Sequence, residues 1–220
     1  KEEVTAAWYK REAEGMIREI QGRGHVPLLV GGSMLYLSAV IDDLQFAGEA
    51  SPALRRTLGE EYDCDGGAAL FRKLQELDPE TALSLEPRNK VYLIRALEIC
   101  MLAGGKASAA KKKSSCPFAL FIIGVTRSRE ELHRRIAERT RQMFASGWVE
   151  EVRSLLARGS TTNDPALQSH GYREIARGIT EGGGTNLAGL VEIIAAKTRQ
   201  YAKRQETWWR RDPRIRWITP

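Results

Sequence analysis

The sequence predicts an α/β fold in which a parallel sheet, flanked by helices, is interrupted by an inserted helical domain. Two observations support this. Short continuous apolar runs at 27–32 and 118–126 are typical of buried strands in a parallel sheet. Between them, residues 44–115 show helical patterns and no convincing strand. We therefore assign residues 1–43 and 116–220 to one α/β core and 44–115 to a helical insertion domain.

The composition is that of a globular protein. With 220 residues, 42% of them hydrophobic, the chain can bury the core of one or two domains. No apolar run approaches the ~20 residues that span a bilayer, and the first residues are too charged for a secretory signal. Cys64, Cys100 and Cys116 are odd in number and widely spaced, which fits a reducing compartment and indicates neither a zinc site nor a disulfide framework. We expect a soluble cytoplasmic protein.

The first α/β unit precedes the insertion. Apolar residues recur near helical spacing over 5–22, which predicts an amphipathic helix. The run 27–30 then predicts a strand, Gly31 and Gly32 a turn, and Ser33 the start of the next helix. Ligands of open α/β sheets usually bind at the loops that follow the strands, so this turn is a candidate site.

The insertion carries clear helix signals. Asp78 and Pro79 predict a helix start, because Asp is favoured at the N-cap and Pro at the first helical position. A second helix over 91–103 ends at Gly104. Residues 106–117 contain a run of lysines and predict a polar, flexible linker back to the core.

The remaining elements of the core follow the second strand. In order, they are a helix over 128–143 that begins with a capping box, a helix over 148–158, a helix starting at Asp164-Pro165, a long helix over 187–209 and a final strand at 215–219.

The first candidate site is Gly31-Gly32-Ser33. Free backbone N–H groups and a hydroxyl at the start of a helix suit an anionic ligand. Ser33 could instead be only the cap of the next helix, and this interpretation is favoured when the stretch is taken alone. The stretch lacks the GK[ST] ending of a phosphate-binding P-loop.

The second candidate site is a pair of arginines. Arg135 and Arg139 are four residues apart and share one face of a predicted helix, with Arg141 nearby. Two guanidinium groups on one face suit a diphosphate, because each makes bidentate charge-assisted hydrogen bonds. Taken alone, the pattern favours a solvated basic face, with Glu130, Glu131 and Glu138 as partners.

The third candidate is the basic C-terminal helix. The net charge is +6, and residues 197–217 hold eight Lys or Arg against two acids. Basic residues interleaved with Gln and aromatic residues suit an RNA backbone with unstacked bases. An amphipathic helix with its tryptophans in the core is an equal alternative. His25, His133 and His170 show no metal-ligand spacing, and His170 reads as structural.

Together these stretches resemble one family. PLLVGGSMLY, LDPETA, LIRALEI, SREELHRRIAERTRQM, GYREI and TRQYAKRQETW follow one another in the order found in the tRNA dimethylallyltransferases, also called tRNA isopentenyltransferases. Each motif is weak alone, but the set is specific and covers nearly the whole chain. The resemblance implies a P-loop-kinase-like α/β core with a helical insertion domain, and transfer of a dimethylallyl group from dimethylallyl diphosphate to N6 of the adenine 3′-adjacent to the anticodon of tRNA.

The resemblance also implies roles for particular residues. Ser33 matches the family's hydroxyl residue beside the reacting groups, although threonine is more common there, and Gly31 and Gly32 precede it. Arg135 and Arg139 match the arginines that bind the diphosphate. The segment near the RNA maps to Arg199, Gln200, Lys203, Arg204, Gln205 and Trp208. Arg95 is matched too, and an internal ion pair with Glu98 or a neighbour is one possible role for it.

One part of the family pattern is missing from this sequence. The family begins with a GxTxSGK[ST]-like P-loop, which cradles the diphosphate and Mg²⁺, and a D-S-x-Q stretch that supplies the proposed general base. Neither occurs here, and Lys1 corresponds to a point downstream of both. We expect the biological protein to carry them, so the Mg²⁺ ligands are expected outside this chain, with none within it.

Three other functions remain open from the sequence. An adenylate isopentenyltransferase acting on free AMP, ADP or ATP would share the diphosphate site, but needs less of the basic helix. A non-catalytic tRNA-binding fragment would need no P-loop. A P-loop nucleotide kinase would leave the basic helix unexplained. The resemblance leads us to expect a monomer whose partners are dimethylallyl diphosphate and the tRNA anticodon stem-loop, with no membrane partner.

Overall fold

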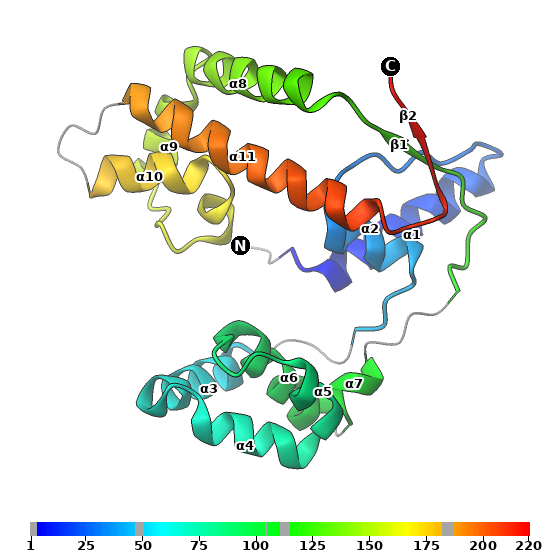
Figure 1. Cartoon of the computed structure of the whole chain (residues 1–220), viewed down its shortest axis with the longest axis vertical. Helices are drawn as coiled ribbons and strands as arrows, with labels where there is room; N and C mark the ends of the chain where they lie inside the picture. Colours follow the sequence, from blue (N-terminus) through cyan, green and yellow to red (C-terminus); the bar gives the residue numbers. More distant parts are fainter. Residues whose placement is uncertain (1–3, 47–50, 104, 111–114, 182–186) are drawn as a thin grey trace. The chain divides into compact units, whose positions relative to one another are not determined.

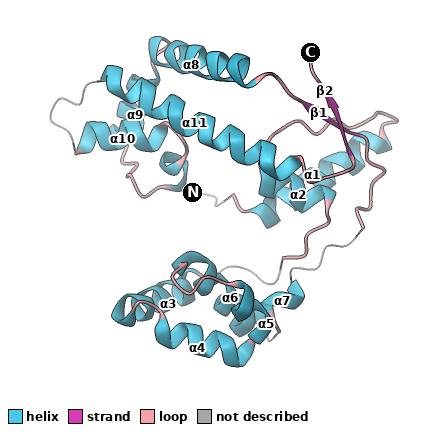
Figure 2. Cartoon of the chain, in the orientation of Figure 1, coloured by secondary structure: helices cyan, strands magenta, loops and turns pink. Residues whose placement is uncertain are grey.

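The computed structural model describes residues 4–46, 51–103, 105–110, 115–181 and 187–220. It divides into two compact units, residues 1–120 and 121–220, and each is dominated by helices (Figures 1 and 2). The assignment of residues 1–43 and 116–220 to a single core remains a prediction.

The first unit begins with two packed helices, α1 (Ala6–Gly22) and α2 (Met34–Ile41) (Figure 1). The Thr5 hydroxyl caps α1 by accepting a hydrogen bond from the Trp8 N–H at 3.1 Å. Tyr9 and Tyr36 stack between the helices with ring centroids 4.8 Å apart. The last four residues of α2, Ser38–Ile41, are buried. The two helices expected here are therefore confirmed.

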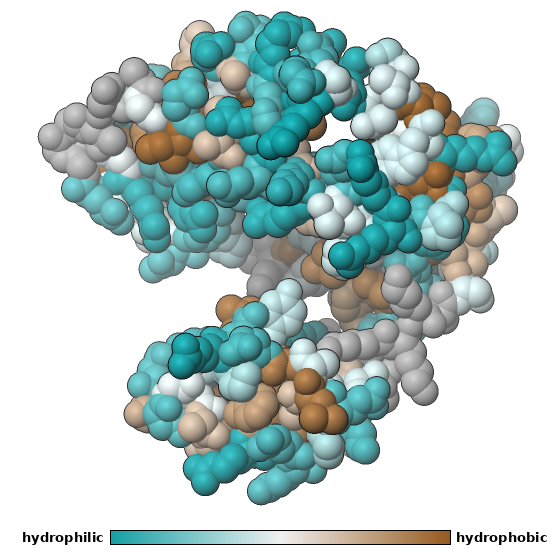
Figure 3. Space-filling view, in the orientation of Figure 1, coloured by the Kyte–Doolittle hydropathy of each residue, from teal (hydrophilic) through white to brown (hydrophobic). Residues whose placement is uncertain are grey.

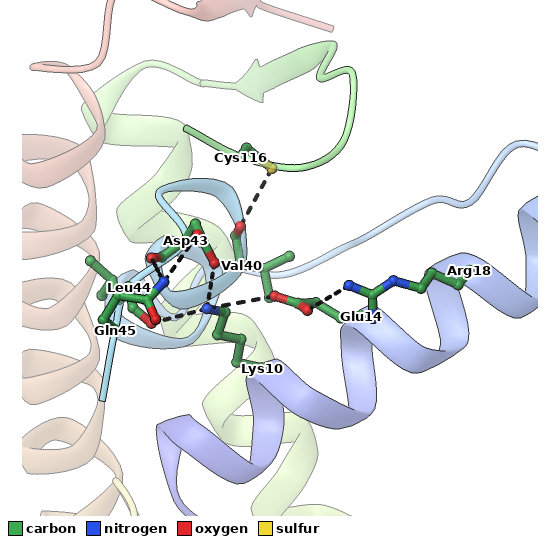
Figure 4. A network of polar contacts seen from close by, with 8 residues as sticks. All are labelled: Lys10, Glu14, Arg18, Val40, Asp43, Leu44, Gln45 and Cys116. Atoms are coloured by element: carbon green, nitrogen blue, oxygen red, sulfur yellow. Dashed lines mark hydrogen bonds and ion pairs between the residues drawn. The ribbon is translucent and has the colours of Figure 1, made fainter. Parts of the chain in front are cut away.

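A lysine holds the chain in place where it leaves α2 (Figure 4). Lys10 Nζ on α1 donates to Asp43 Oδ1 at 2.5 Å and to the Leu44 carbonyl oxygen at 3.1 Å. Glu14 lies 3.7 Å from the same ammonium and also pairs with Arg18 at 3.0 Å. Asp43 has a φ of 44°, a left-handed conformation that is costly for a residue other than glycine. Contacts with Lys10 therefore help to maintain a strained turn.

Replacing Lys10 by Met is expected to loosen this turn. The variant leaves the Asp43 carboxylate and the Leu44 carbonyl without their lysine donor, so the local free energy of opening should fall by about 1–2 kcal/mol. Hydrogen exchange of peptides from α1 and from residues 34–46 would measure it. The matched control is Arg11→Met, since Arg11 is exposed on the same helix and pairs only with its neighbour Glu12 among the described contacts. Equal exchange in both variants would contradict the prediction.

The strand expected at 27–32 is wrong. The structure shows no strand there, and Val26, Leu28 and Val30 are 92%, 85% and 80% exposed. A strand forms all its ladder hydrogen bonds with a neighbouring strand, so an apolar run cannot become one by itself. Leu28, Leu29 and Val30 are all exposed, so this run has strand-forming composition but no strand partner among the described residues.

The segment predicted to form the insertion domain is helical, as expected. Its elements are α3 (Pro52–Asp65), α4 (Ala68–Leu77), α5 (Pro79–Ser84), α6 (Lys90–Ala103) and α7 (Ala107–Ala110). They form what we call the helical block, residues 51–110, whose core is lined by Leu58, Leu70, Leu74, Ala82, Leu93, Leu97 and Cys100. In Figure 3, hydrophobic residues are exposed between hydrophilic residues on the surface of this block.

Two details of the insertion differ from or extend the expectation. The expected flexible linker 106–117 contains the short helix α7, which is anchored by Ala107 at 1% exposure. The lysines of the linker, 111–113, and Gly104 lie outside the described residues. Arg95 makes the ion pair with Glu98 that the sequence left open, which confirms that interpretation.

The second unit contains a two-stranded parallel sheet. Strand β1 (Ile122–Val125) pairs with β2 (Ile215–Ile218), with Ile122 opposite Ile215. The final strand is thus confirmed. The strand predicted at 118–126 is shorter than expected and is not buried, because Ile123 and Val125 are exposed and Ile122 and Gly124 are only partly buried.

The rest of the unit is built from helices. They are α8 (Arg129–Ala145), α9 (Trp148–Ala157), the 3₁₀ helix η1 (Pro165–Gln168), α10 (Tyr172–Thr180) and α11 (Leu187–Trp209). Asp164-Pro165 therefore begins a single 3₁₀ turn where an α-helix was expected. Helices α9, α10 and α11 pack around a hydrophobic core that includes Trp148, Val152, Ile175 and Ile194.

Candidate active site

The turn before α2 presents the Ser33 hydroxyl. Ser33 occupies the N-cap of α2, with φ −66° and ψ 113°, and its carbonyl oxygen accepts the first helical hydrogen bond from the Leu37 N–H at 3.0 Å. Its hydroxyl makes no capping hydrogen bond to the described part of the helix. Ser33 therefore stands at the N-cap position without the side-chain cap that the sequence favoured, so the interpretation of its hydroxyl as only a helix cap is wrong.

The arginine pair lies on α8. The Ser128 hydroxyl caps this helix by accepting from the Glu131 N–H at 3.2 Å. The Glu131 carboxylate accepts from Arg134 at 2.9 and 3.0 Å and from Arg135 Nε at 2.6 Å. These hydrogen bonds, with Arg134 first and Arg135 second, lower the pKa of Glu131 to about 2. Arg135 is thus held by an anion of its own helix.

Arg139 has a different environment. It is exposed on α8, and the structure shows no ion pair or hydrogen bond for its side chain among the described residues. Arg141, on the same helix, is shared between Glu138 and Glu192 at 3.8 Å each. The solvated-face interpretation therefore applies to Arg141 and in part to Arg135, while Arg139 keeps its donors unused.

Helix α11 carries the RNA-facing candidates of the sequence. Gln200, Lys203, Arg204 and Trp208 are exposed, whereas Arg199 and Gln205 are half-buried. Trp208 is 51% exposed, so it is not a core residue as the alternative interpretation required. The Arg204 guanidinium lies over the Tyr201 ring at 5.6 Å, and the His170 ring lies 5.2 Å from the same tyrosine.

A buried carboxylate fixes α11 against α10. Glu174 Oε1 accepts from Lys197 Nζ at 2.6 Å, and Oε2 accepts from the Gly171 N–H at 2.8 Å. Burial raises the pKa of Glu174, but the hydrogen bonds from Lys197 and Gly171 outweigh it and lower this pKa to about 2. The sequence did not reveal this contact, although the GYREI motif contains Glu174. Lys197 belongs to the basic run 197–217, but in the structure it positions the helix.

The structure brings together only part of the predicted site. Helices α8 and α11 pack against each other in the second unit, so the arginine pair and the basic helix share one scaffold (Figure 1). Ser33 belongs to the first unit. The individual assignments of Gly31, Gly32 and Ser33 remain predictions.

Neither a metal centre nor a membrane segment is found in the described part of the chain. Three or more His, Cys, Asp or Glu side chains do not gather anywhere among these residues in a way that could hold a metal ion. Within the same residues, every helix is too short or too polar to cross a membrane. The first finding does not test the expected Mg²⁺.

Comparison with known proteins identifies the family. The family model described as "IPPT: IPP transferase" matches residues 1–212. A protein of Geobacter sulfurreducens named tRNA dimethylallyltransferase is 38% identical over 217 residues, which cover 97% of this chain and 69% of that protein. The crystal structure of the tRNA isopentenylpyrophosphate transferase of Bacillus halodurans is 33% identical, covers 99% of this chain and 68% of its own, and has a TM-score of 0.65.

A second solved structure supports the fold alone. A eukaryotic dimethylallyltransferase, described as acting on tRNA, is 23% identical and has a TM-score of 0.81 over 99% of this chain. These likenesses confirm the predicted fold class, a P-loop-kinase-like α/β core with flanking helices, of which the described residues contribute the two strands and eleven α-helices. The chain therefore belongs to the IPP transferase family.

Proposed function

We propose that this protein transfers a dimethylallyl group from dimethylallyl diphosphate to N6 of the adenine 3′-adjacent to the anticodon in tRNA. The observation that carries the proposal is the family match over residues 1–212, together with 38% identity to a protein named tRNA dimethylallyltransferase. The exposed basic and aromatic side chains of α11 favour a polynucleotide acceptor over a free nucleotide.

The reaction sets three demands on the site. The bond between the allylic carbon and the diphosphate oxygen breaks, a bond from that carbon to N6 forms, and N6 loses a proton. The adenine amine is a poor nucleophile, so it needs a hydrogen-bonding partner that orients it. The departing diphosphate needs cations, and water must be kept from the allylic centre.

Residues of this chain can meet two of these demands. Arg135 and Arg139 would bind the diphosphate and stabilise the negative charge that develops as it leaves. The Ser33 hydroxyl, which is not used as a helix cap, would orient the reacting groups. The RNA would lie along Arg199, Gln200, Lys203, Arg204, Gln205 and Trp208. Each of these roles is a proposal that rests on the family resemblance.

Further properties are proposed on the same basis. Mg²⁺ would neutralise the diphosphate when bound, but the described residues contain no cluster of side chains that could hold it. A nucleotide-binding P-loop would lie outside this sequence. We propose a cytoplasmic monomer that has no membrane partner.

The test uses the protein expressed from its complete gene. It is incubated with labelled dimethylallyl diphosphate, Mg²⁺ and either unmodified tRNA or free AMP. Label at the adenine beside the anticodon is the expected result. Label on AMP alone would replace the proposal with an adenylate isopentenyltransferase. Label on neither substrate would leave a non-catalytic RNA-binding role.

Replacing the two predicted diphosphate ligands should impair turnover. Arg135→Ala and Arg139→Ala each remove a guanidinium from the leaving group, so kcat/KM for dimethylallyl diphosphate should fall about 100-fold, as for loss of one transition-state donor. Steady-state kinetics with tRNA held saturating would measure it. Arg141→Ala is the control, because Arg141 lies on the same helix but pairs with two glutamates. If Arg135→Ala keeps the parental kcat/KM, Arg135 does not bind the departing diphosphate.

Removing the anion that holds Arg135 should have the opposite effect on binding. In Glu131→Gln the guanidinium loses its competing carboxylate, so KM for dimethylallyl diphosphate should fall about 2- to 5-fold, the scale of an exposed ion pair. Glu130→Gln is the control, since Glu130 is exposed on the same turn and is not among the ion pairs described. A raised KM would instead show that Glu131 positions Arg135 productively.

A further inference from the structure

Two arginines of the helical block share one buried carboxylate. Glu98 on α6 is 0% exposed, and its oxygens accept hydrogen bonds from Arg55 Nε on α3 at 2.9 and 3.1 Å. Arg95 Nη1 donates to Glu98 Oε2, and the Ser51 N–H donates to Oε1 at 2.8 Å. Burial raises the pKa of Glu98, but the hydrogen bonds from Arg55 and Arg95 outweigh it and keep this pKa below its ordinary value. The Glu98 carboxylate is therefore an anion at neutral pH.

The arrangement leaves unused positive charge at the surface. One carboxylate balances one of the two guanidinium groups. Each guanidinium has five N–H donors, yet the described contacts use only Nε of Arg55 and only Nη1 of Arg95. The two arginine side chains are 42% and 34% exposed, whereas Glu98 is inaccessible. The remaining donors can therefore reach a ligand from solvent while the carboxylate cannot be displaced easily.

The surrounding charges are distributed unevenly. Arg55 and Arg56 lie in the first turns of α3, whereas four acids follow at Glu60, Glu61, Asp63 and Asp65. The block as a whole is not basic, since residues 51–110 carry eight Lys or Arg and nine Asp or Glu. Binding of an anion by this block must therefore be local, and the end of α3 that holds Arg55 is where positive charge is in excess.

We propose that Arg55 and Arg95 form a phosphate clamp, anchored by Glu98, that binds a backbone phosphate of the RNA acceptor. Guanidinium groups match phosphate oxygens through paired N–H donors, and a fixed pair loses less entropy on binding than two free side chains. This inference rests on the proposed function, because it takes RNA as the source of the phosphate. Arg55 and Arg95 touch no reacting atom and act in binding alone.

The first test measures RNA affinity. Arg55→Gln, Arg95→Gln and the control Arg72→Gln are titrated against a labelled anticodon stem-loop RNA by fluorescence anisotropy over a range of KCl concentrations. Arg72 is exposed on α4 of the same block and loses the same charge. Each clamp variant should weaken binding about 5- to 10-fold and lower the slope of log K against log salt by about 0.7–0.9, as for one lost phosphate contact. The control should keep the parental values.

The second test uses the unmodified protein, so it does not depend on any variant folding. Phenylglyoxal modification of arginines is followed by mass spectrometry with and without the stem-loop RNA. RNA should protect Arg55 and Arg95 and leave Arg72 reactive. Inorganic phosphate at the same phosphate concentration should give little protection. Protection by phosphate alone, with none from RNA, would overturn the proposal.

The outcomes separate this proposal from the proposed function. The protein could label tRNA while RNA fails to protect Arg55 and Arg95 and binds the Gln variants as tightly as the parent. In that case the clamp proposal is wrong and the proposed activity stands. If the protein binds no RNA, the clamp is overturned, and label transfer to AMP decides the activity independently. Resistance of Cys100, which is buried in the block core, to alkylation confirms that each variant remains folded.

Discussion

Gly171→Ala is expected to destabilise the second unit by about 2–4 kcal/mol. Gly171 has a backbone φ of 88°, which residues other than glycine rarely adopt. A Cβ built on it would lie 2.0 Å from the Trp148 ring. That ring cannot move freely, because it is 6% exposed and packs edge-on against Phe144 at 5.7 Å and Tyr172 at 5.5 Å. The variant therefore combines backbone strain with a steric clash in a packed core.

A second glycine separates these two contributions. Gly147 has a φ of 94°, but a Cβ built on it meets no atom within 4 Å. Gly147→Ala should therefore lower the free energy of unfolding only through backbone strain, by about 1 kcal/mol. Urea unfolding followed by tryptophan fluorescence would measure both variants, since four of the five tryptophans lie in residues 121–220. Equal losses for the two variants would show that Trp148 yields to the new methyl group.

The effect should extend to function. The Gly171 N–H donates to Glu174, which in turn holds Lys197 of α11. Displacement of the Gly171 turn would therefore disturb the anchor of the helix that carries the predicted RNA contacts. We expect Gly171→Ala to raise the KM for tRNA more than the KM for dimethylallyl diphosphate, whereas Gly147→Ala should change neither.

Local sequence signals predicted several of the helices correctly. Helix starts at Asp78-Pro79 and Ser128 and the long helix α11 are all present, because caps and helical periodicity depend on residues a few positions apart. Signals that depend on distant partners failed. The run at 27–32 has strand composition, but a strand also needs a neighbour, and the described residues give it none.

The candidate site residues come from the resemblance and remain predictions, and their contacts could not be predicted from the sequence. The resemblance selected Arg135 and Arg139, but nothing in the spacing distinguished the one held by Glu131 from the one without a described partner. Glu98 was a suggested partner of Arg95, three positions away, whereas Arg55 lies 43 positions from Glu98 and was not foreseen. Likewise Lys197 was counted with the basic surface, and only the fold reveals its contact with Glu174. Long-range pairing of charges is decided by packing, which one sequence does not display.

Asp78→Asn is expected to destabilise the helical block by about 2 kcal/mol near neutral pH. The Asp78 carboxylate is 0% exposed and accepts four hydrogen bonds, from the Thr81 hydroxyl at 2.6 Å, the Thr81 N–H at 3.2 Å, the Ser108 N–H at 2.7 Å and the Ser108 hydroxyl at 3.0 Å. It thus caps α5 and ties it to α7. An asparagine presents one oxygen and an NH₂ group to four donors, so at least some of them lose their partner.

The pH dependence of this loss identifies its origin. Burial raises the pKa of Asp78, but the hydrogen bonds from Thr81 and Ser108 outweigh it and lower the folded-state pKa from 3.8 to about 2. Since the folded pKa lies below the unfolded value, the stabilisation is fully present above about pH 4 and is lost as the pH falls through about 2. The protonated carboxyl then resembles the amide, and the difference between the parent and Asp78→Asn should shrink.

Hydrogen exchange of α5 and α6 peptides, corrected for the intrinsic rate, would follow this difference between about pH 6 and pH 2.5. Asp63→Asn is the control, because Asp63 is 68% exposed and pairs with Lys90 at the surface of the same block, so its loss should be small. A difference for Asp78→Asn that persists unchanged at low pH would show that the amide is poorly accommodated for its shape. A difference that disappears would show that charged acceptance by Asp78 holds α5 and α7 together, and that the segment expected to be a flexible linker is fixed at its first turn by one carboxylate.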